Sequence, residues 1–249
     1  MPGEIKDALA RALRPLFNFT YTARGGLVCG MRRRGGLGFL PGRRLTPEER
    51  WLAQRPWAGR VVYDVGAWEG VFTLFFARAV GATGQVIAFE PNPFNAMRLR
   101  ENLALNGLTN ARLVELALGE RAGSAWLAAP AGASGRGALV LTPTDLPVAV
   151  QTLDGLVEAS ALPAPDFVKI DVEGAELAVL RGGADTLARR RPALLIEVHP
   201  QADYAALWAF LDALGYAMRC VETGQALSAP DAPLTEKSAW HLAAQARAA

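Results

Sequence analysis

Three residue types are scarce in this chain of 249 residues, which has two cysteines, two histidines and three lysines. Cys29 and Cys220 are distant in sequence, so they predict neither a disulfide framework nor a zinc site. Every apolar run is far shorter than the roughly 20 residues of a membrane-spanning helix. The N-terminal stretch also carries charges that argue against a secretory signal; they are Glu4, Lys6, Asp7, Arg11 and Arg14. These absences predict a cytoplasmic protein with no integral membrane segment.

Apolar side chains are plentiful, at 51% of all residues, which is enough for a full-sized core. The length suits one α/β domain with an appendage better than two full domains. The net charge of +2 is unevenly distributed, because residues 1–60 hold 12 Lys and Arg against 4 Asp and Glu. This basic segment is either a surface for nucleic acid, anionic lipid or an acidic substrate, or a solvated arm. We favour the solvated arm and do not expect nucleic acid as a partner, since no aromatic residues alternate with the arginines.

From residue 60 onward the chain alternates strand-like and helix-like segments. This alternation predicts an α/β fold with a mostly parallel sheet and helices on both faces. The strand candidates are Val61–Val65, Gln85–Phe89, Ala111–Leu116, Phe167–Val172 and Ala193–Val198. The helix candidates are Val71–Val80, Pro93–Asn106, Ala175–Arg181 and Asp203–Leu214. Residues 216–222 and 238–244 are predicted to add two last strands as a terminal hairpin.

Residues 1–57 precede this alternation and are predicted to be an N-terminal extension of a domain that spans residues 58–249. The extension starts with a helical apolar pattern over residues 3–17 and continues with a Gly- and Arg-rich segment over 18–44. It ends in a helix that begins at Thr46, where Thr-Pro-Glu-Glu supplies an N-cap, a first-turn proline and the capping-box residue Glu49. Within the domain, residues 130–137 are either a lid over a site or a surface hairpin tip.

The first predicted strand runs into the loop Asp64-Val-Gly-Ala-Trp-Glu-Gly, and a helix follows. Glycine at positions 66 and 70 lets the backbone approach a ligand closely, and a helix N-terminus offers free N–H groups to an anion. Dinucleotide-binding loops read G-x-G-x-x-G, whereas this loop reads G-x-x-x-G. The loop therefore suits a small anion, such as a methionyl carboxylate, better than a pyrophosphate.

The second predicted strand ends in Phe89-Glu-Pro, followed by Asn92. Glu90 lies 24 positions after Gly66, where an acidic side chain can accept hydrogen bonds from both hydroxyls of a ribose. Pro91 restricts the turn, and Asn92 can cap the next helix. The alternative is that Glu90 is only a charge at a helix entry. An adenosine with free ribose hydroxyls and no required pyrophosphate describes S-adenosylmethionine.

Three more motifs follow these two in order: Thr152-Leu-Asp-Gly-Leu, Lys169-Ile-Asp-Val-Glu-Gly-Ala-Glu-Leu-Ala-Val-Leu-Arg-Gly and Ile196-Glu-Val-His. Together the motifs resemble the FkbM family of S-adenosylmethionine-dependent methyltransferases over roughly residues 60–200. The resemblance implies a class I methyltransferase fold with a seven-stranded sheet and S-adenosylmethionine as the cofactor. It also implies O-methylation of a hydroxyl on a sugar, polyketide or related metabolite. We assign eight residues to the cofactor: Asp64, Gly66, Ala67, Gly70, Glu90, Pro91, Asn92 and Asp171.

Charges at two further strand ends predict where the chemistry takes place, because ligands of open α/β sheets bind beyond the carboxyl ends of strands. Asp171 is the first candidate for the base or for orienting the acceptor, and His199 is the alternative because its ordinary pKa lies near neutrality. Lys169 shares a strand face with Asp171; it either holds a carboxylate of a ligand or, as we prefer, pairs with nearby acids. Asp171, Glu197 and His199 are also a conceivable Mg²⁺ set, although we expect no metal.

Two other functions stay open at this point. One is a nicotinamide-dependent oxidoreductase on a similar sheet, which the missing middle glycine of the loop disfavours. The other is a non-catalytic protein that binds polyanions through the Arg-rich extension. Our prediction is an S-adenosylmethionine-dependent methyltransferase whose partner is a small-molecule or glycosidic acceptor.

Overall fold

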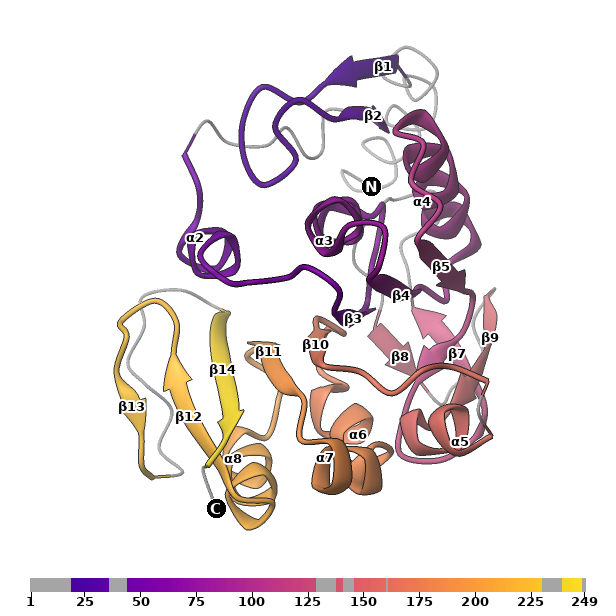
Figure 1. Ribbon diagram of the computed structural model, residues 1–249. Helices are drawn as coiled ribbons and strands as arrows, with labels where there is room; N and C mark the ends of the chain where they lie inside the picture. Colours follow the sequence, from indigo (N-terminus) through magenta and orange to yellow (C-terminus); the bar gives the residue numbers. More distant parts are fainter. Residues whose placement is uncertain are drawn as a thin grey trace, which may run out of the picture.

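The computed structural model describes residues 19–35, 44–128, 138–140, 146–159, 161–229 and 239–247. Its centre is an eight-stranded sheet with the strand order β13-β12-β14-β11-β10-β3-β4-β5 (Figure 1). The helix predicted over residues 3–17 and the lid or hairpin tip predicted over 130–137 lie outside the described residues. Within the described ranges, no helix combines the length and the apolar character needed to cross a membrane.

Five neighbouring strands of the sheet are parallel: β5 (Ala111–Val114), β4 (Gln85–Phe89), β3 (Val61–Val65), β10 (Phe167–Ile170) and β11 (Ala193–Val198). β14 (Trp240–Ala246) pairs antiparallel with β11, and β12 (Tyr216–Cys220) pairs antiparallel with β14. The two-residue β13 (Ala226–Leu227) adds an edge beside β12. The predicted α/β fold with a mostly parallel sheet is confirmed, but the predicted number of seven strands is one too low because β13 joins the edge.

Helices cover both faces of the sheet, as predicted (Figure 1). One face carries α2 (Pro47–Ala53), α3 (Val71–Val80) and α4 (Pro93–Leu105). The other carries α5 (Leu153–Glu158), α6 (Glu176–Arg181), α7 (Ala184–Arg190) and α8 (Tyr204–Ala213). The predicted bounds of α3, α4, α6 and α8 agree with the structure to within one residue. α5 and α7 were not predicted, because Gly155 disfavours a helix in α5 and Leu187 is the one large apolar residue of α7.

Side chains from successive positions of each strand enter two separate cores. Val62 and Phe167 are buried on the face of α3, whereas Tyr63 and Val168 are buried on the face of α6 to α8. This division follows from the alternation of side chains along a strand. Lys169 lies two residues after Phe167 and therefore emerges on the α3 face, close to the ends of the strands.

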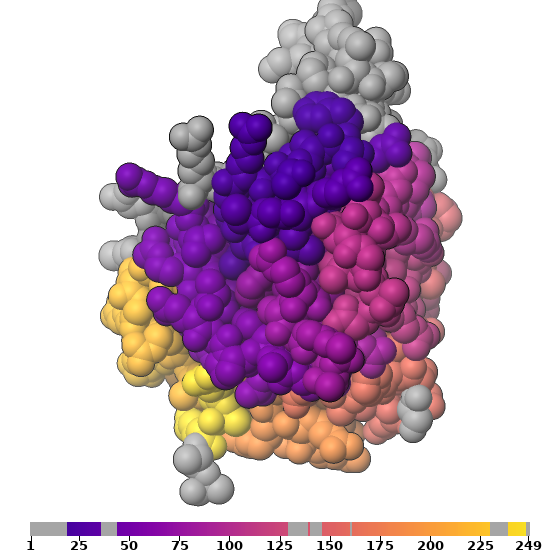
Figure 2. Space-filling view, turned by 45° about the horizontal axis from the view of Figure 1, so that its top comes forward, coloured from indigo at the N-terminus to yellow at the C-terminus, as the bar shows by residue number. Residues whose placement is uncertain are grey.

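The described part of the N-terminal extension begins with an antiparallel hairpin of β1 (Phe19–Thr22) and β2 (Arg32–Gly35). Two backbone N–H groups of β2 donate to asparagine side chains: Arg34 to Asn102 of α4 at 2.7 Å, and Arg32 to Asn106, the residue that caps the end of α4, at 2.8 Å. The two asparagines thus take the place of a neighbouring strand. In the space-filling view the indigo residues of this hairpin lie against the magenta part of the chain (Figure 2).

The end of the extension, α2, begins with the capping box that the sequence predicts. The side chain of Thr46 accepts a hydrogen bond from the Glu49 N–H at 3.2 Å, and the Glu49 carboxylate accepts one from the Thr46 N–H at 3.0 Å. Leu52 and Trp57 are buried in the same core as Phe167 of the sheet. The described extension therefore shares its core with the domain that follows, and the boundary between residues 57 and 58 stays a prediction.

A second, four-stranded sheet has the order β6-β9-β7-β8 and was not predicted. Its strands are β6 (Ala117–Leu118), β7 (Gly123–Ala128), β8 (Ala138–Val140) and β9 (Pro147–Gln151). Ala125, Leu127, Val148 and Val150 form its small core. These four residues alternate with more exposed ones, which is the period-two pattern that would have revealed the strands.

Candidate active site

The loop between β3 and α3 lies tightly against the neighbouring strand and helix. Gly66 and Gly70 have left-handed backbone, with φ of +81° and +88°. A Cβ on Gly66 would lie 1.8 Å from the backbone oxygen of Asp171, and one on Gly70 would lie 2.1 Å from Leu99 Cδ1. Glycine is thus required both for the turn and for the close approach. α3 begins at Val71 without a side-chain cap, so its first N–H groups can serve an anion.

Glu90 follows β4 and holds this loop from the adjacent strand end. Its Oε2 accepts a hydrogen bond from the Trp68 N–H at 2.7 Å. Its Oε1 accepts one from the Asn92 N–H at 2.9 Å and one from Asn95 Nδ2 at 3.2 Å. Burial raises the pKa of the Glu90 carboxyl, although these donors oppose the rise. A carboxylate offers about four acceptor positions, so one position on Oε2 remains.

Two buried ionisable side chains, Asp64 on β3 and Lys169 on β10, lie beneath the loop. Asp64 and Lys169 are direct neighbours in the parallel register, and both are almost fully buried. Asp64 accepts a hydrogen bond from Thr73 Oγ1 at 2.6 Å, and Lys169 Nζ lies 3.1 Å from Asp171 Oδ2. Burial lowers the pKa of Lys169, but Asp171 and the other nearby carboxylates raise it more, so the net shift is upward. Lys169 is therefore a charged ammonium paired with Asp171, the pairing that we preferred.

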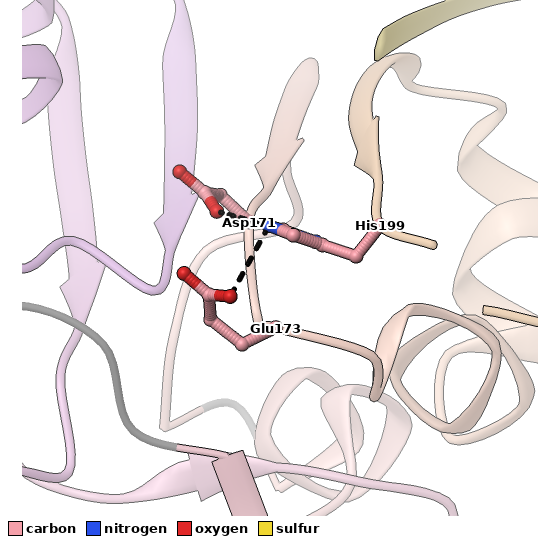
Figure 3. Close-up of side chains that lie close together, drawn as sticks. All are labelled: Asp171, Glu173 and His199. Atoms are coloured by element: carbon pink, nitrogen blue, oxygen red, sulfur yellow. Dashed lines mark ion pairs between the residues drawn. The ribbon is translucent and has the colours of Figure 1, made fainter. Parts of the chain in front are cut away.

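His199 follows β11 and stands among carboxylates. Its Nδ1 donates to Oε1 of Glu176 at 2.7 Å, and Glu176 is fully buried at the start of α6. Its Nε2 lies 3.8 Å from Asp171 Oδ1 and 3.5 Å from Glu173 Oε2, and Figure 3 shows both carboxylates directed at the imidazole. Burial lowers the pKa of His199, but the hydrogen bond to Glu176 and the nearby acids raise it above its ordinary value. Nδ1 is thus held by Glu176, and Nε2 lies within 3.8 Å of carboxylate oxygens of Asp171, Glu173 and Glu197.

The second histidine, His241 on β14, lies in a closed cluster beside this one. Its Nδ1 is 2.6 Å from Glu222 Oε1, and its Nε2 is 2.8 Å from Glu48 Oε2. Burial lowers the pKa of His241, but hydrogen bonds to acids outweigh burial and raise it to about 11. His241 is also the cross-strand neighbour of Glu197. Because Glu48 belongs to α2, this charged imidazole ties the extension to the sheet.

The structure brings the predicted site residues to one edge of the sheet. Gly66, Glu90, Asp171 and His199 follow the carboxyl ends of four strands that are neighbours in the sheet. β10 pairs in parallel with β3, so Asp171 lies next to the strand that presents the loop. Ala67 and Pro91 lie in the same two turns as Gly66 and Glu90, and Asn92 caps α4 by accepting a hydrogen bond from the Phe94 N–H at 2.9 Å.

The roles of Glu176 and His241 were not predicted. The one sequence signal for Glu176 is that it is a second acid three residues after Glu173, at a predicted helix start, and its burial beside His199 became evident only in the structure. His241 shows no such local signal, since its contacts depend on the register of β14 beside β11.

Known proteins resemble this chain in sequence and in fold. The family model described as the methyltransferase FkbM domain matches residues 64–218. Hexuronic acid methyltransferase AglP of Haloferax volcanii is 31% identical over 148 residues, which are 57% of this chain and 57% of that protein. The chain thus matches little more than half the length of this curated relative.

Two solved structures share the fold of the chain. The methyltransferase FkbM of Methylobacillus flagellatus KT has a TM-score of 0.52 and 18% identity, covering 80% of this chain and 50% of that one. A putative rRNA methylase of Clostridium thermocellum has a TM-score of 0.51 and 8% identity, covering 79% of this chain and 91% of that one. With the family model matched over more than half of its residues, the chain belongs to the methyltransferase FkbM domain family, as its motifs predicted.

Proposed function

We propose that the protein is an S-adenosylmethionine-dependent methyltransferase that methylates a hydroxyl group of a sugar or a related small metabolite. The observation that carries the proposal is the convergence of the Gly66 loop, Glu90 and Asp171 at one edge of a sheet of this family. The name of the Haloferax relative, a hexuronic acid methyltransferase, directs the choice of acceptor towards sugars that carry a carboxylate.

The residues around the loop fit this cofactor. The open N-terminus of α3 suits the methionyl carboxylate, and the short glycine loop leaves no pyrophosphate site of the dinucleotide type. Glu90 has one acceptor position left on Oε2 for a ribose hydroxyl, and the bond from Asn95, at 3.2 Å the longest of its three, is the easiest to exchange for a second hydroxyl. Asp64 is buried beneath the loop and hydrogen-bonded to Thr73, so we assign it to holding the loop.

Bound S-adenosylmethionine supplies a methyl group on a sulfonium, which is already activated for displacement. The residues of the chain must then hold the acceptor oxygen in line with that methyl group and receive its proton. The cluster of Asp171, Glu173 and His199 offers the proton-accepting groups, at the strand ends next to the loop. Lys169 is 1% exposed and engaged with Asp171, so its proposed role is to hold that carboxylate in place.

Calorimetric titration with S-adenosylhomocysteine tests the cofactor. We expect Glu90→Gln to weaken binding about 10-fold to 100-fold, because a hydrogen bond to a charged acceptor contributes about 1.5–3 kcal/mol. Glu115→Gln is the matched control, since its carboxylate is exposed and paired with Arg100 instead. No binding to the unaltered protein at millimolar ligand, or a thermal shift with NAD alone, would refute the cofactor assignment.

Methyl transfer tests the acceptor. The full chain is incubated with methyl-labelled S-adenosylmethionine and either a hexuronic acid glycoside or the corresponding neutral hexose glycoside. We expect the label in the product, and more of it with the acid. If S-adenosylhomocysteine binds but neither glycoside is labelled, the sugar assignment is wrong and the cofactor assignment stands. The predicted cytoplasmic location remains a prediction.

A further inference from the structure

The two histidines of the chain meet their carboxylates in different ways. Although only Nδ1 of His241 has hydrogen-bond geometry, both ring nitrogens of His241 lie less than 3 Å from a carboxylate oxygen, at 2.6 and 2.8 Å. At His199 only Nδ1 does so, 2.7 Å from Glu176. Its Nε2 makes no hydrogen bond to any residue that the structure describes, although His199 is only 8% exposed. That nitrogen faces the oxygens of Asp171 and Glu173 across gaps of 3.8 and 3.5 Å (Figure 3).

We propose that Asp171, Glu173 and His199 bind a divalent metal ion. Their three ligand atoms all lie within 4.8 Å of one another. Atoms about 2.1–2.2 Å from an ion stand about 3.0 Å apart at a right angle and about 3.5 Å apart at a tetrahedral angle. The gaps at His199 Nε2 therefore match coordination to within a few tenths of an ångström, while they are too long for hydrogen bonds.

The groups behind the three ligands are arranged as a metal site requires. A histidine that binds a metal usually donates its other N–H to a carboxylate, which sets the ring orientation and the tautomer. Glu176, fully buried, accepts that hydrogen bond from Nδ1 and leaves the Nε2 lone pair directed at the two acids. Lys169 contacts Oδ2 of Asp171, so the Oδ1 that faces His199 remains for the ion.

The charges also favour a cation. Four carboxylates lie within 3.8 Å of the His199 nitrogens: those of Asp171, Glu173, Glu176 and Glu197. The buried ammonium of Lys169 contacts the carboxylate of Asp171, and the charged imidazole of His241 lies 3.7 Å from that of Glu197. The mixed set of imidazole and carboxylate ligands suits a transition metal such as Mn²⁺ better than the all-oxygen ligation that Mg²⁺ prefers. The metal set considered from the sequence contained Glu197 instead of Glu173. In the structure Glu197 is shared with the second histidine, since its Oε2 lies 3.7 Å from His241 Nε2.

The role of the ion rests on the proposed function. Three protein ligands leave two or three coordination positions open at the strand ends next to the cofactor loop. Two adjacent oxygens of a sugar, such as a hydroxyl beside a carboxylate, can occupy such positions together. The ion then orients the acceptor and makes its hydroxyl easier to deprotonate, and the proton passes to a carboxylate of the same cluster.

Titration of the full chain with Mn²⁺, followed by the electron paramagnetic resonance of free Mn²⁺, tests the site without any cofactor. We expect one bound ion per chain. Glu176→Gln removes only the support of His199 and should weaken Mn²⁺ binding about 10-fold to 100-fold. Glu173→Gln and His199→Ala each remove a ligand and should weaken Mn²⁺ binding more than Glu176→Gln does. His241→Gln is the matched control and should bind as the unaltered protein does.

Circular dichroism shows which variants fold, and Asp212→Asn on the surface replaces the control if His241→Gln does not. Glu173→Gln, at a partly exposed position, carries the test if His199→Ala does not fold. The proposal is wrong if the unaltered protein binds no Mn²⁺ at millimolar concentration, or if a control weakens binding as much as Glu173→Gln. Binding of S-adenosylhomocysteine without Mn²⁺ binding refutes the metal site alone, whereas Mn²⁺ binding without S-adenosylhomocysteine binding refutes the proposed function alone.

Discussion

Replacement of Gly66 by alanine tests the argument that the cofactor loop needs glycine for close packing. The added Cβ would lie 1.8 Å from the backbone oxygen of Asp171, whereas real Cβ contacts are essentially never below 3.0 Å. The loop and β10 must therefore separate by about 1 Å at this point. Two backbone hydrogen bonds span the affected region, from Gly66 to Phe89 and from Asp171 to Val65, each at 3.0 Å.

The cost follows from these contacts. The left-handed backbone at Gly66, φ +81°, costs an alanine about 1–2 kcal/mol. Weakening the two hydrogen bonds costs about 1 kcal/mol each. We expect Gly66→Ala to lower the free energy of unfolding by about 3–4 kcal/mol, which most folded domains survive. The displaced loop should also bind S-adenosylhomocysteine about tenfold more weakly or worse, since tenfold corresponds to only about 1.4 kcal/mol.

Gly107→Ala is the matched control for this prediction. Gly107 follows α4 with φ +63°, and a Cβ there would meet no atom within 4 Å. It therefore carries the backbone cost of about 1–2 kcal/mol without the collision. Urea denaturation of both variants and calorimetry with S-adenosylhomocysteine give the comparison. Equal destabilisation, with cofactor affinity unchanged in both, would show that the approach of the loop to Asp171 does not require glycine.

Three further predictions concern the buried polar contacts. His241→Ala should lower the free energy of unfolding by about 3–5 kcal/mol, because it leaves the carboxylates of Glu48 and Glu222 without the imidazole between them. The pKa of His241 rises from 6.5 to about 11 on folding, so its contribution to stability is complete below pH 6.5 and is lost as the pH rises through 11. Urea denaturation from pH 6 to 11 should show this loss in the unaltered protein and not in His241→Ala. Tyr216→Phe removes a hydroxyl that lies 3.0 Å from a buried carbonyl oxygen, and should lower the free energy of unfolding by about 1–2 kcal/mol. Asn102→Ala removes the bridge between β2 and the Glu69 carbonyl, so calorimetry should show weaker S-adenosylhomocysteine binding as well as lower stability.

Much of the fold could be predicted because local patterns determine it. The bounds of β3, β4, β11 and α3 match the predicted ones residue for residue, since each is an apolar run of suitable length between turn residues. The capping box at Thr46 is equally local. The small second sheet was missed although β7 and β9 show a period-two pattern. The short helices α5 and α7 were missed because Gly155 disfavours a helix in the first and Leu187 is the one large apolar residue of the second.

The site divides in the same way. The sequence by itself determined that Lys169 and Asp171 share a strand face and that Gly66 and Glu90 follow strands, because alternation and turn chemistry are properties of neighbouring residues. Only the tertiary structure decided which acid faces His199. The register of β14 beside β11 places His241 opposite Glu197, and Glu173 lies closer to His199 Nε2 than Glu197 does. That register joins residues 44 positions apart, and no local pattern specifies which distant strands pair.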